Sequence, residues 1–167
     1  MKTYTFIDAS NIIYGTRDEG WRVDFRKLFK YLRERYKSEI IYYFAGVEKN
    51  NPKQEGFYKL LNKIGYHLIL KPVKLYLQPD GKKVRKANCD VDLTFFTMKE
   101  ITKFNRAIFF TGDGDFEILI KYLLEKDKTV IIFANASRTA REIKVLKGIQ
   151  FNDLRVLKEV VEFKAKK

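Results

Sequence analysis

The chain has 167 residues, with 34 Lys and Arg against 21 Asp and Glu, so its formal net charge of +13 favours an anionic partner. This length suits one domain with a substantial core, and a hydrophobic content of 46% excludes global disorder. The single cysteine, Cys89, excludes an intramolecular disulfide and a cysteine-based zinc site.

The first half of the chain alternates strand-like apolar runs with amphipathic segments. Its predicted elements are a strand at 3–8, a turn-prone polar stretch through Gly20, a helix capped by Asp24 and ending near 37, a strand at 39–45, a helix opened by Asn51 and Pro52 and ending near 64, and a strand at 67–70. The next stretch differs, because the basic runs 71–77 and 82–86 flank the turn signal Pro79-Asp80-Gly81. This pattern predicts a basic β-hairpin flap.

The second half returns to alternation. Its predicted elements are a helix at 90–104, a strand at 107–111, a helix at 116–125, a strand at 129–134, a helix capped by Ser137 and ending near 146, and a last helix starting at Asn152 or Asp153. Repeated strand–helix alternation predicts an α/β fold with a mostly parallel sheet and helices on both faces.

Aspartates stand where predicted strands end or helices begin. Asp8 closes the first strand, Asp90 opens a helix, and Asp113 and Asp115 follow the strand at 107–111 within Gly112-Asp113-Gly114-Asp115. The carboxyl ends of parallel strands converge on one crevice, and clustered carboxylates persist by sharing a proton or holding a cation. Asn11 could orient a metal-bound water or a phosphate oxygen there.

Capping is the alternative interpretation of these residues. Asp8 and Asn11 could simply build a helix cap or a turn, and a cap needs only one of Asp113 and Asp115. The two glycines would let the backbone turn sharply and approach a ligand closely. Asp92 lies about 200° around the helix from Asp90, so only one of the two can face the site, and Asp90 is the better candidate.

The predicted flap carries the candidate contacts to nucleic acid. Tyr76 could stack on a base, although a hairpin that covers the core with snorkelling lysines would have the same sequence. The candidate nucleic-acid-binding residues are Lys74, Lys82, Lys83, Arg85 and Lys86.

Three segments, in order, resemble the NYN (LabA-like) branch of the PIN-domain nucleases. They are Phe6-Ile-Asp8-Ala-Ser-Asn11, Lys86-Ala-Asn-Cys-Asp90-Val-Asp92-Leu and Thr111-Gly-Asp113-Gly-Asp115-Phe116. The resemblance implies a PIN-like three-layer α/β/α sandwich over residues 1–162. It also implies RNA cleavage dependent on Mg²⁺ or Mn²⁺, with Asp8, Asp90, Asp113 and Asp115 as the metal site and Asn11 in support. The sequence itself predicts a frayed basic tail at 163–167.

One position departs from the family pattern. Members often carry a further aspartate six residues after the one that matches Asp90, and this chain has Phe96 there. Asp92 lies four residues before Phe96, on a similar helical face, so it could supply the missing carboxylate as an additional metal ligand. Otherwise the site is weakened.

The leading hypothesis is a divalent-metal-dependent ribonuclease acting on single-stranded RNA. The alternative is an RNA-binding PIN-like module with weak or no catalysis, motivated by Phe96. A Toprim-like enzyme fits less well, because that pattern needs a glutamate on an early strand and this chain has Asp8 there. A phosphatase-like enzyme of the haloacid type also fits less well, because Ser10 stands where the second aspartate of its Asp-x-Asp motif is needed. No run approaches the roughly 18 apolar residues of a membrane span, and Asp8 comes too early for a secretory signal. We therefore expect a cytoplasmic protein without a membrane partner, and the sequence leaves a homodimer open.

Overall fold

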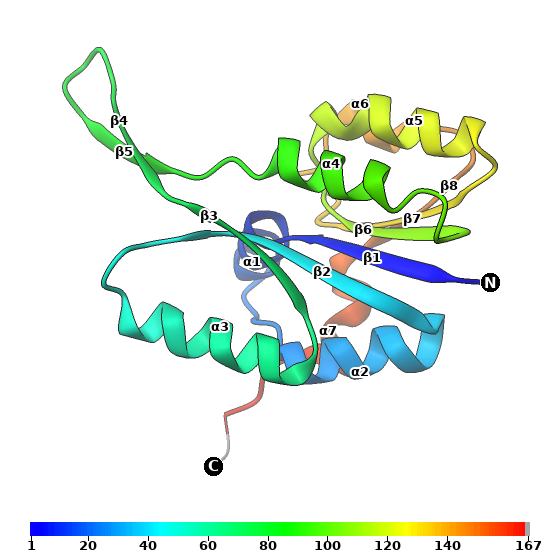
Figure 1. The fold of residues 1–167 in the computed structure, drawn as a ribbon, viewed down its shortest axis with the longest axis horizontal. Helices are drawn as coiled ribbons and strands as arrows, with labels where there is room; N and C mark the ends of the chain where they lie inside the picture. Colours follow the sequence, from blue (N-terminus) through cyan, green and yellow to red (C-terminus); the bar gives the residue numbers. More distant parts are fainter. Residues whose placement is uncertain (166–167) are drawn as a thin grey trace.

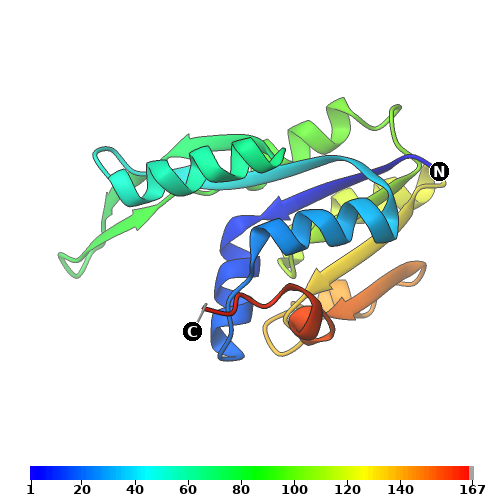
Figure 2. The ribbon, with the colours of Figure 1, turned by 90° about the horizontal axis from the view of Figure 1, so that it is seen from below.

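A six-stranded parallel sheet forms the centre of the computed structural model, which describes residues 1–165 (Figures 1 and 2). Its strands run in the order β3-β2-β1-β6-β7-β8. Their bounds are β1 (Thr3–Asp8), β2 (Ser38–Val47), β3 (His67–Pro72), β6 (Arg106–Phe110), β7 (Thr129–Ala134) and β8 (Ile149–Asp153). Every neighbouring pair in this sheet is parallel. The predicted mostly parallel sheet is therefore confirmed.

Helices cover both faces of the sheet. The helices are α1 (Ala9–Asp18), α2 (Phe25–Tyr36), α3 (Pro52–Ile64), α4 (Asp90–Lys99), α5 (Glu117–Glu125), α6 (Arg141–Lys144) and α7 (Lys158–Val161). In Figure 1, α2, α3 and α7 lie below the sheet, and α4, α5 and α6 lie above it. The α/β/α sandwich expected from the sequence is confirmed.

The central strands β1, β6 and β7 have almost no exposed face, because each side of the sheet packs on helices there. Alternate residues of β1 enter different cores: Ile7 packs with the α1, α2 and α3 side, and Phe6 with the α4 and α5 side. Both side chains are fully buried. This explains why the strands read as continuous apolar runs.

The strand order reverses between β1 and β6. From β1 the chain builds β2 and β3 on one side, and from β6 it builds β7 and β8 on the other. Adjacent strands whose connections diverge in this way leave a crevice at their carboxyl ends, where ligands of open α/β sheets bind. Asp8 ends β1, and the segment 111–115 follows β6, so both reach this crevice.

Two predicted helix starts follow the expected capping chemistry. Asp24 Oδ1 accepts hydrogen bonds from the backbone N–H groups of Arg26 (2.9 Å) and Lys27 (3.2 Å). Asn51 Oδ1 accepts one from the N–H of Gln54 (3.1 Å). These bonds satisfy donors that the first turn of a helix leaves free.

The N-terminal stretch after β1 corrects the sequence interpretation. Residues 9–18, expected as a polar turn, form α1. Its Asn11, Gly15 and Thr16 are poor helix formers, which hid the helix from propensity. Tertiary packing decides instead, because Ile12 is buried in the core and the backbone at Gly15 packs closely on Leu154 and Asn135.

The C-terminal third holds three further corrections. The helix predicted to end at 104 stops at Lys99. Ser137 does not cap a helix: its hydroxyl bonds to Asn135 Oδ1 (2.6 Å) within a turn, and α6 begins only at Arg141. β8 was not predicted, although Asp153 does cap the 3₁₀ helix Leu154–Leu157 that follows it.

The basic hairpin is present as predicted. β4 (Lys74–Leu77) and β5 (Lys83–Lys86) pair in antiparallel fashion, outside the main sheet. The hairpin projects away from the body in both views (Figures 1 and 2). Gly81, with φ +81, makes its turn in a conformation that side chains other than glycine rarely adopt.

The end of the described chain returns to the body. The backbone N–H of Phe163 donates to the carbonyl of Arg22 (2.8 Å). Residues 166 and 167 of the predicted frayed tail lie outside the described residues. Within residues 1–165, every helix is too short or too polar to cross a membrane.

Candidate metal centre

Three aspartates gather at the crevice beside β6. One carboxylate oxygen from each of Asp90, Asp113 and Asp115 lies within 4.8 Å of the other two. Asp90 and Asp113 are half-buried and Asp115 is exposed, so the group opens to solvent. Hard cations such as Mg²⁺ and Mn²⁺ prefer oxygen ligands, and Mg²⁺ keeps several waters beside a few carboxylates. An open set of three carboxylates fits such an ion.

The electrostatics of Asp90 favour a cation. Burial raises the pKa of Asp90, and the negative charges of Asp113 and Asp115 raise it further. The Asn88 hydrogen bond and the Lys86 ammonium oppose this effect. A raised pKa means that the fold penalises the ionised carboxylate, and a bound divalent cation would remove that penalty.

Asp113 serves the loop as well as the group. Its Oδ1 accepts a hydrogen bond from the Asp115 N–H (3.0 Å) and caps the 3₁₀ helix Gly114–Phe116. Its own N–H donates to Thr111 Oγ1 (3.3 Å). The capping interpretation therefore holds for Asp113, but it accounts for one oxygen only, and it does not require Asp115.

The glycines of this loop are needed for close packing. A Cβ on Gly112 would lie 2.7 Å from Thr139 Oγ1 and 3.1 Å from Ala134 Cβ, and one on Gly114 would lie 3.1 Å from Ala140 Cβ. Neither glycine has a positive φ. The loop therefore does not need glycine for a left-handed backbone conformation, and it needs glycine because it lies against the segment that follows β7.

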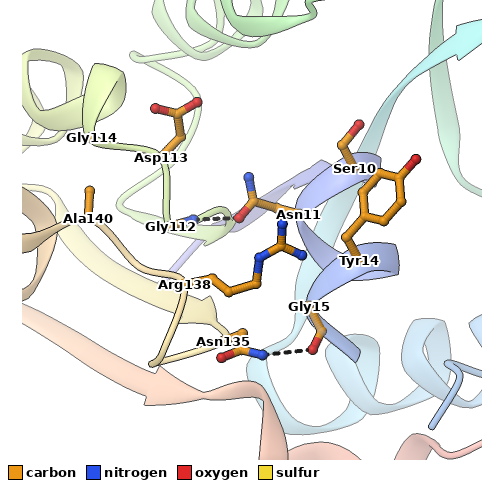
Figure 3. A pocket seen from close by; sticks show the side chains of 10 residues that line it. All are labelled: Ser10, Asn11, Tyr14, Gly15, Gly112, Asp113, Gly114, Asn135, Arg138 and Ala140. Carbon is orange, nitrogen blue, oxygen red and sulfur yellow. Dashed lines mark hydrogen bonds between the residues drawn. The ribbon is translucent and has the colours of Figure 1, made fainter. Parts of the chain in front are cut away.

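Asp8 and Asn11 lie behind the three aspartates. Asn11 Nδ2 donates to Asp8 Oδ2 (3.0 Å), and Asn11 Oδ1 accepts from the N–H of Gly112 (3.0 Å). Burial raises the pKa of Asp8, the Asn11 bond lowers it, and the charge of Asp90 raises it. Within residues 1–165, Asp8 is not a member of the three-aspartate group. The side chain of Asn11 thus joins the end of β1 to the loop after β6 (Figure 3).

Asp92 and Phe96 face away from the group. Asp92 Oδ2 pairs with Lys71 Nζ at 2.9 Å. The Phe96 ring packs on the sheet, with ring centroids 5.4 Å from Tyr42 and 6.0 Å from Phe44. At the position where the family pattern often has an aspartate, Phe96 therefore contributes to core packing and supplies no carboxylate.

The five candidate RNA-binding residues are all exposed on the hairpin. Lys74 pairs with Lys86 across the strands, so both lie on one face, and Lys83 and Arg85 lie on the other. Arg85 also makes an ion pair with Glu48 (3.4 Å). Positive charge therefore occurs on both faces of the hairpin.

A cavity of about 350 Å³ adjoins the centre (Figure 3). Its walls include Ser10, Asn11, Tyr14, Asp113, Asn135 and Arg138. Tyr14, Asn135 and Arg138 are not among the site residues predicted from the sequence. Asn135 follows β7 directly, and a polar residue at a strand end was the available signal.

An acidic centre at the switch point of a parallel α/β/α sandwich fits a metal-dependent nuclease of the PIN-like class. Residues 2–150 match the NYN domain, so the chain belongs to the NYN domain family. It is similar to the Low amplitude and bright protein LabA of Synechococcus elongatus, with 28% identity over 163 residues covering 94% of this chain and 87% of that protein.

A solved structure supports the fold. A crystal structure of a protein of unknown function from Vibrio parahaemolyticus matches with a TM-score of 0.77 and 23% sequence identity. The match covers 97% of this chain and 96% of the other. At this identity the likeness concerns the fold alone.

Proposed function

We propose that this protein is a ribonuclease that uses Mg²⁺ or Mn²⁺ to hydrolyse phosphodiester bonds of single-stranded RNA. The observation that carries the proposal is the convergence of Asp90, Asp113 and Asp115 at the carboxyl end of β6 in a chain of the NYN family. The net charge of +13 supports a polyanionic substrate.

The chain would contribute ligands and positioning. Asp90, Asp113 and Asp115 would hold the ion, with Asp8 as a further ligand or as the acceptor that orients Asn11. A bound ion of this kind activates water and stabilises the charge that develops on the phosphodiester. Asn11 keeps the Gly112 backbone and the Asp8 carboxylate at fixed separation, so the two sides of the crevice stay in register. We expect products with a 5′-phosphate and a 3′-hydroxyl.

The hairpin would bind the RNA backbone. When a protein neutralises a phosphate of single-stranded nucleic acid, about 0.7 counterions are released. Replacing Lys74, Lys82, Lys83 and Lys86 together with glutamine should therefore reduce the slope of log affinity against log salt by about 3. Binding that keeps its full salt dependence in this variant would remove the hairpin from the proposal.

The decisive experiment compares two charge-matched variants. Cleavage of labelled single-stranded RNA is measured with Mn²⁺ or Mg²⁺ for Asp113→Asn and for Asp127→Asn. Asp127 is an exposed turn residue between α5 and β7, with φ +57, a conformation that asparagine accepts. We expect a loss of at least about 100-fold for Asp113→Asn and none for Asp127→Asn. Equal rates for the two variants would refute the assignment.

The packing of Phe96 favours a second candidate, an RNA-binding module with little catalysis. Its ring occupies the sheet surface beside Tyr42 and Phe44, so the centre has one carboxylate fewer than many relatives. In that case RNA binding survives chelator, and wild type does not cleave with either metal. If wild type does cleave, Asp92→Asn should keep this activity, because Asp92 pairs with Lys71 and lies outside the three-aspartate group; a loss of cleavage in this variant would instead support Asp92 as a metal ligand.

A further inference from the structure

The cavity beside the metal centre has one wall from α1 and one from the segment after β7. Ser10 and Tyr14 lie on the α1 side, Arg138 lies on the other, and Asp113 is shared with the three-aspartate group. A volume of about 350 Å³ is near the lower end for small-ligand sites. It suits one nucleotide unit and not a duplex.

Tyr14 offers an aromatic surface at the mouth of this cavity. Its side chain is half-exposed, at 50%. The Arg17 guanidinium lies over the ring, with its carbon 5.3 Å from the ring centroid. A cation on one ring face leaves the other for a base, and stacking of this kind accepts any of the four bases.

Arg138 offers a cation opposite Tyr14. Its Nη1 pairs with Asp18 Oδ2 at 3.0 Å, and both side chains are half-exposed. A guanidinium has five N–H donors, so this pair leaves donors for a phosphate. Figure 3 shows the guanidinium extending between Asn11 and Gly15 into the cavity.

The turn that carries Arg138 is held in place before any ligand arrives. Asn135 Nδ2 donates to the carbonyl of Gly15 (2.9 Å), and the N–H of Arg138 donates to the carbonyl of Asn135 (3.0 Å). Thr139 Oγ1 also donates to the Asn135 carbonyl (2.8 Å). The turn is thus tied to α1, so the distance between Tyr14 and Arg138 is preorganised.

We infer that this cavity binds the nucleotide of single-stranded RNA next to the bond that is cut, with the base on Tyr14 and a phosphate on Arg138. That this nucleotide lies next to the cleaved bond rests on the proposed function, because Asp113 both lines the cavity and belongs to the three-aspartate group. Binding of the nucleotide itself does not depend on catalysis.

The test measures binding of a short fluorescein-labelled oligouridylate by anisotropy in the presence of EDTA, where no cleavage occurs. Stacking contributes about 1–3 kcal/mol per base, so Tyr14→Ala should weaken binding by about 5- to 150-fold, and Tyr14→Phe should bind like wild type. Arg138→Gln should weaken binding and reduce the salt slope by about 0.7. Arg35→Gln is the charge-matched control, because Arg35 is exposed on the last turn of α2, near the amino end of β2, and this variant should keep a larger share of the affinity.

The outcomes separate this inference from the ribonuclease proposal. If Tyr14→Ala and Tyr14→Phe bind equally, or Arg138→Gln binds like Arg35→Gln, the inference is overturned, whatever the cleavage results. If the binding losses occur but wild type cleaves no RNA with Mg²⁺ or Mn²⁺, the cavity stands and the ribonuclease proposal fails. Thermal unfolding of each variant confirms that it is folded, and a raised KM with unchanged kcat for Tyr14→Ala supports a binding role.

Discussion

Asn11→Ala should destabilise the protein although Asn11 is only partly buried. The substitution removes the bond from Nδ2 to Asp8 Oδ2 and the bond from the Gly112 N–H to Oδ1, each 3.0 Å long. Gly112 is buried but lines the cavity beside Asn11, so water can replace the lost acceptor of its N–H only in part. The two loops that flank the crevice would then no longer be joined at this point.

The size of the effect follows from the two bonds. A hydrogen bond to a charged acceptor contributes about 1.5–3 kcal/mol, and a buried unsatisfied N–H costs about 1–3 kcal/mol. Water can partly replace the bond at the half-buried Asp8, and alanine returns about 0.5 kcal/mol through its helix propensity in α1. We therefore expect a net loss of about 2–3 kcal/mol, or a fall in Tm of about 4–12 °C for a domain of this size.

Urea unfolding followed by circular dichroism, in chelator, measures this loss. The midpoint should fall at constant m-value, because the substitution changes stability and not the surface exposed on unfolding. Ser10→Ala is the control on the same turn: Ser10 is exposed, and we expect a change within about 0.5 kcal/mol. A loss below about 0.5 kcal/mol for Asn11→Ala would show that its side chain does not hold the loop after β6 to the end of β1.

Three other predictions concern the same crevice. Gly112→Ala should cost about 1–3 kcal/mol, because its Cβ would lie 2.7 Å from Thr139 Oγ1, whereas Gly56→Ala, with nothing within 4 Å, should stabilise slightly; urea midpoints that do not separate the two variants would contradict this. Burial and nearby carboxylates raise the pKa of Asp90, so the penalty on its ionised form acts above that pKa and disappears as pH falls through it. Asp90→Asn should therefore unfold at higher urea than wild type at pH 7 in chelator, and this advantage should shrink towards pH 3; an unchanged or lower midpoint at pH 7 would count against it. Mn²⁺ at about 100 times its Kd should stabilise wild type by about 2.7 kcal/mol, and Asp113→Asn should lose most of this gain in a thermal melt; an equal gain in both proteins would place the ion elsewhere.

The sheet could be predicted because its information is local. Runs such as 107–111 and 129–134 are apolar on both faces, which is typical of strands covered by helices on both sides. Asp113 could be located for the same reason, since it directly follows such a run. Helical spacing also accounts for Asp90 and Asp92 meeting different partners.

The missed features depend on contacts between distant segments. α1 is helical because Ile12 is buried and Gly15 packs on Asn135, 120 residues further along the chain. Arg138 lines the cavity beside Asp113 because β7 lies beside β6, which no local pattern encodes. The sequence shows Gly112 in the acidic loop. The contact with Thr139 that requires a glycine there exists only in the folded chain.

The connection between the hairpin and α4 has a thermodynamic consequence. Only residues 87–89 separate β5 from Asp90, whereas Asp113 and Asp115 belong to a loop fixed on the core. The Asp90 carboxylate therefore lies close to the base of the projecting hairpin, whereas those of Asp113 and Asp115 are attached to the body of the protein. A bound molecule that moves the hairpin towards the crevice changes the separation of the carboxylates, and therefore the affinity of the centre for a cation. By reciprocity, a cation that brings the carboxylates together raises the affinity of the hairpin for that molecule by the same factor.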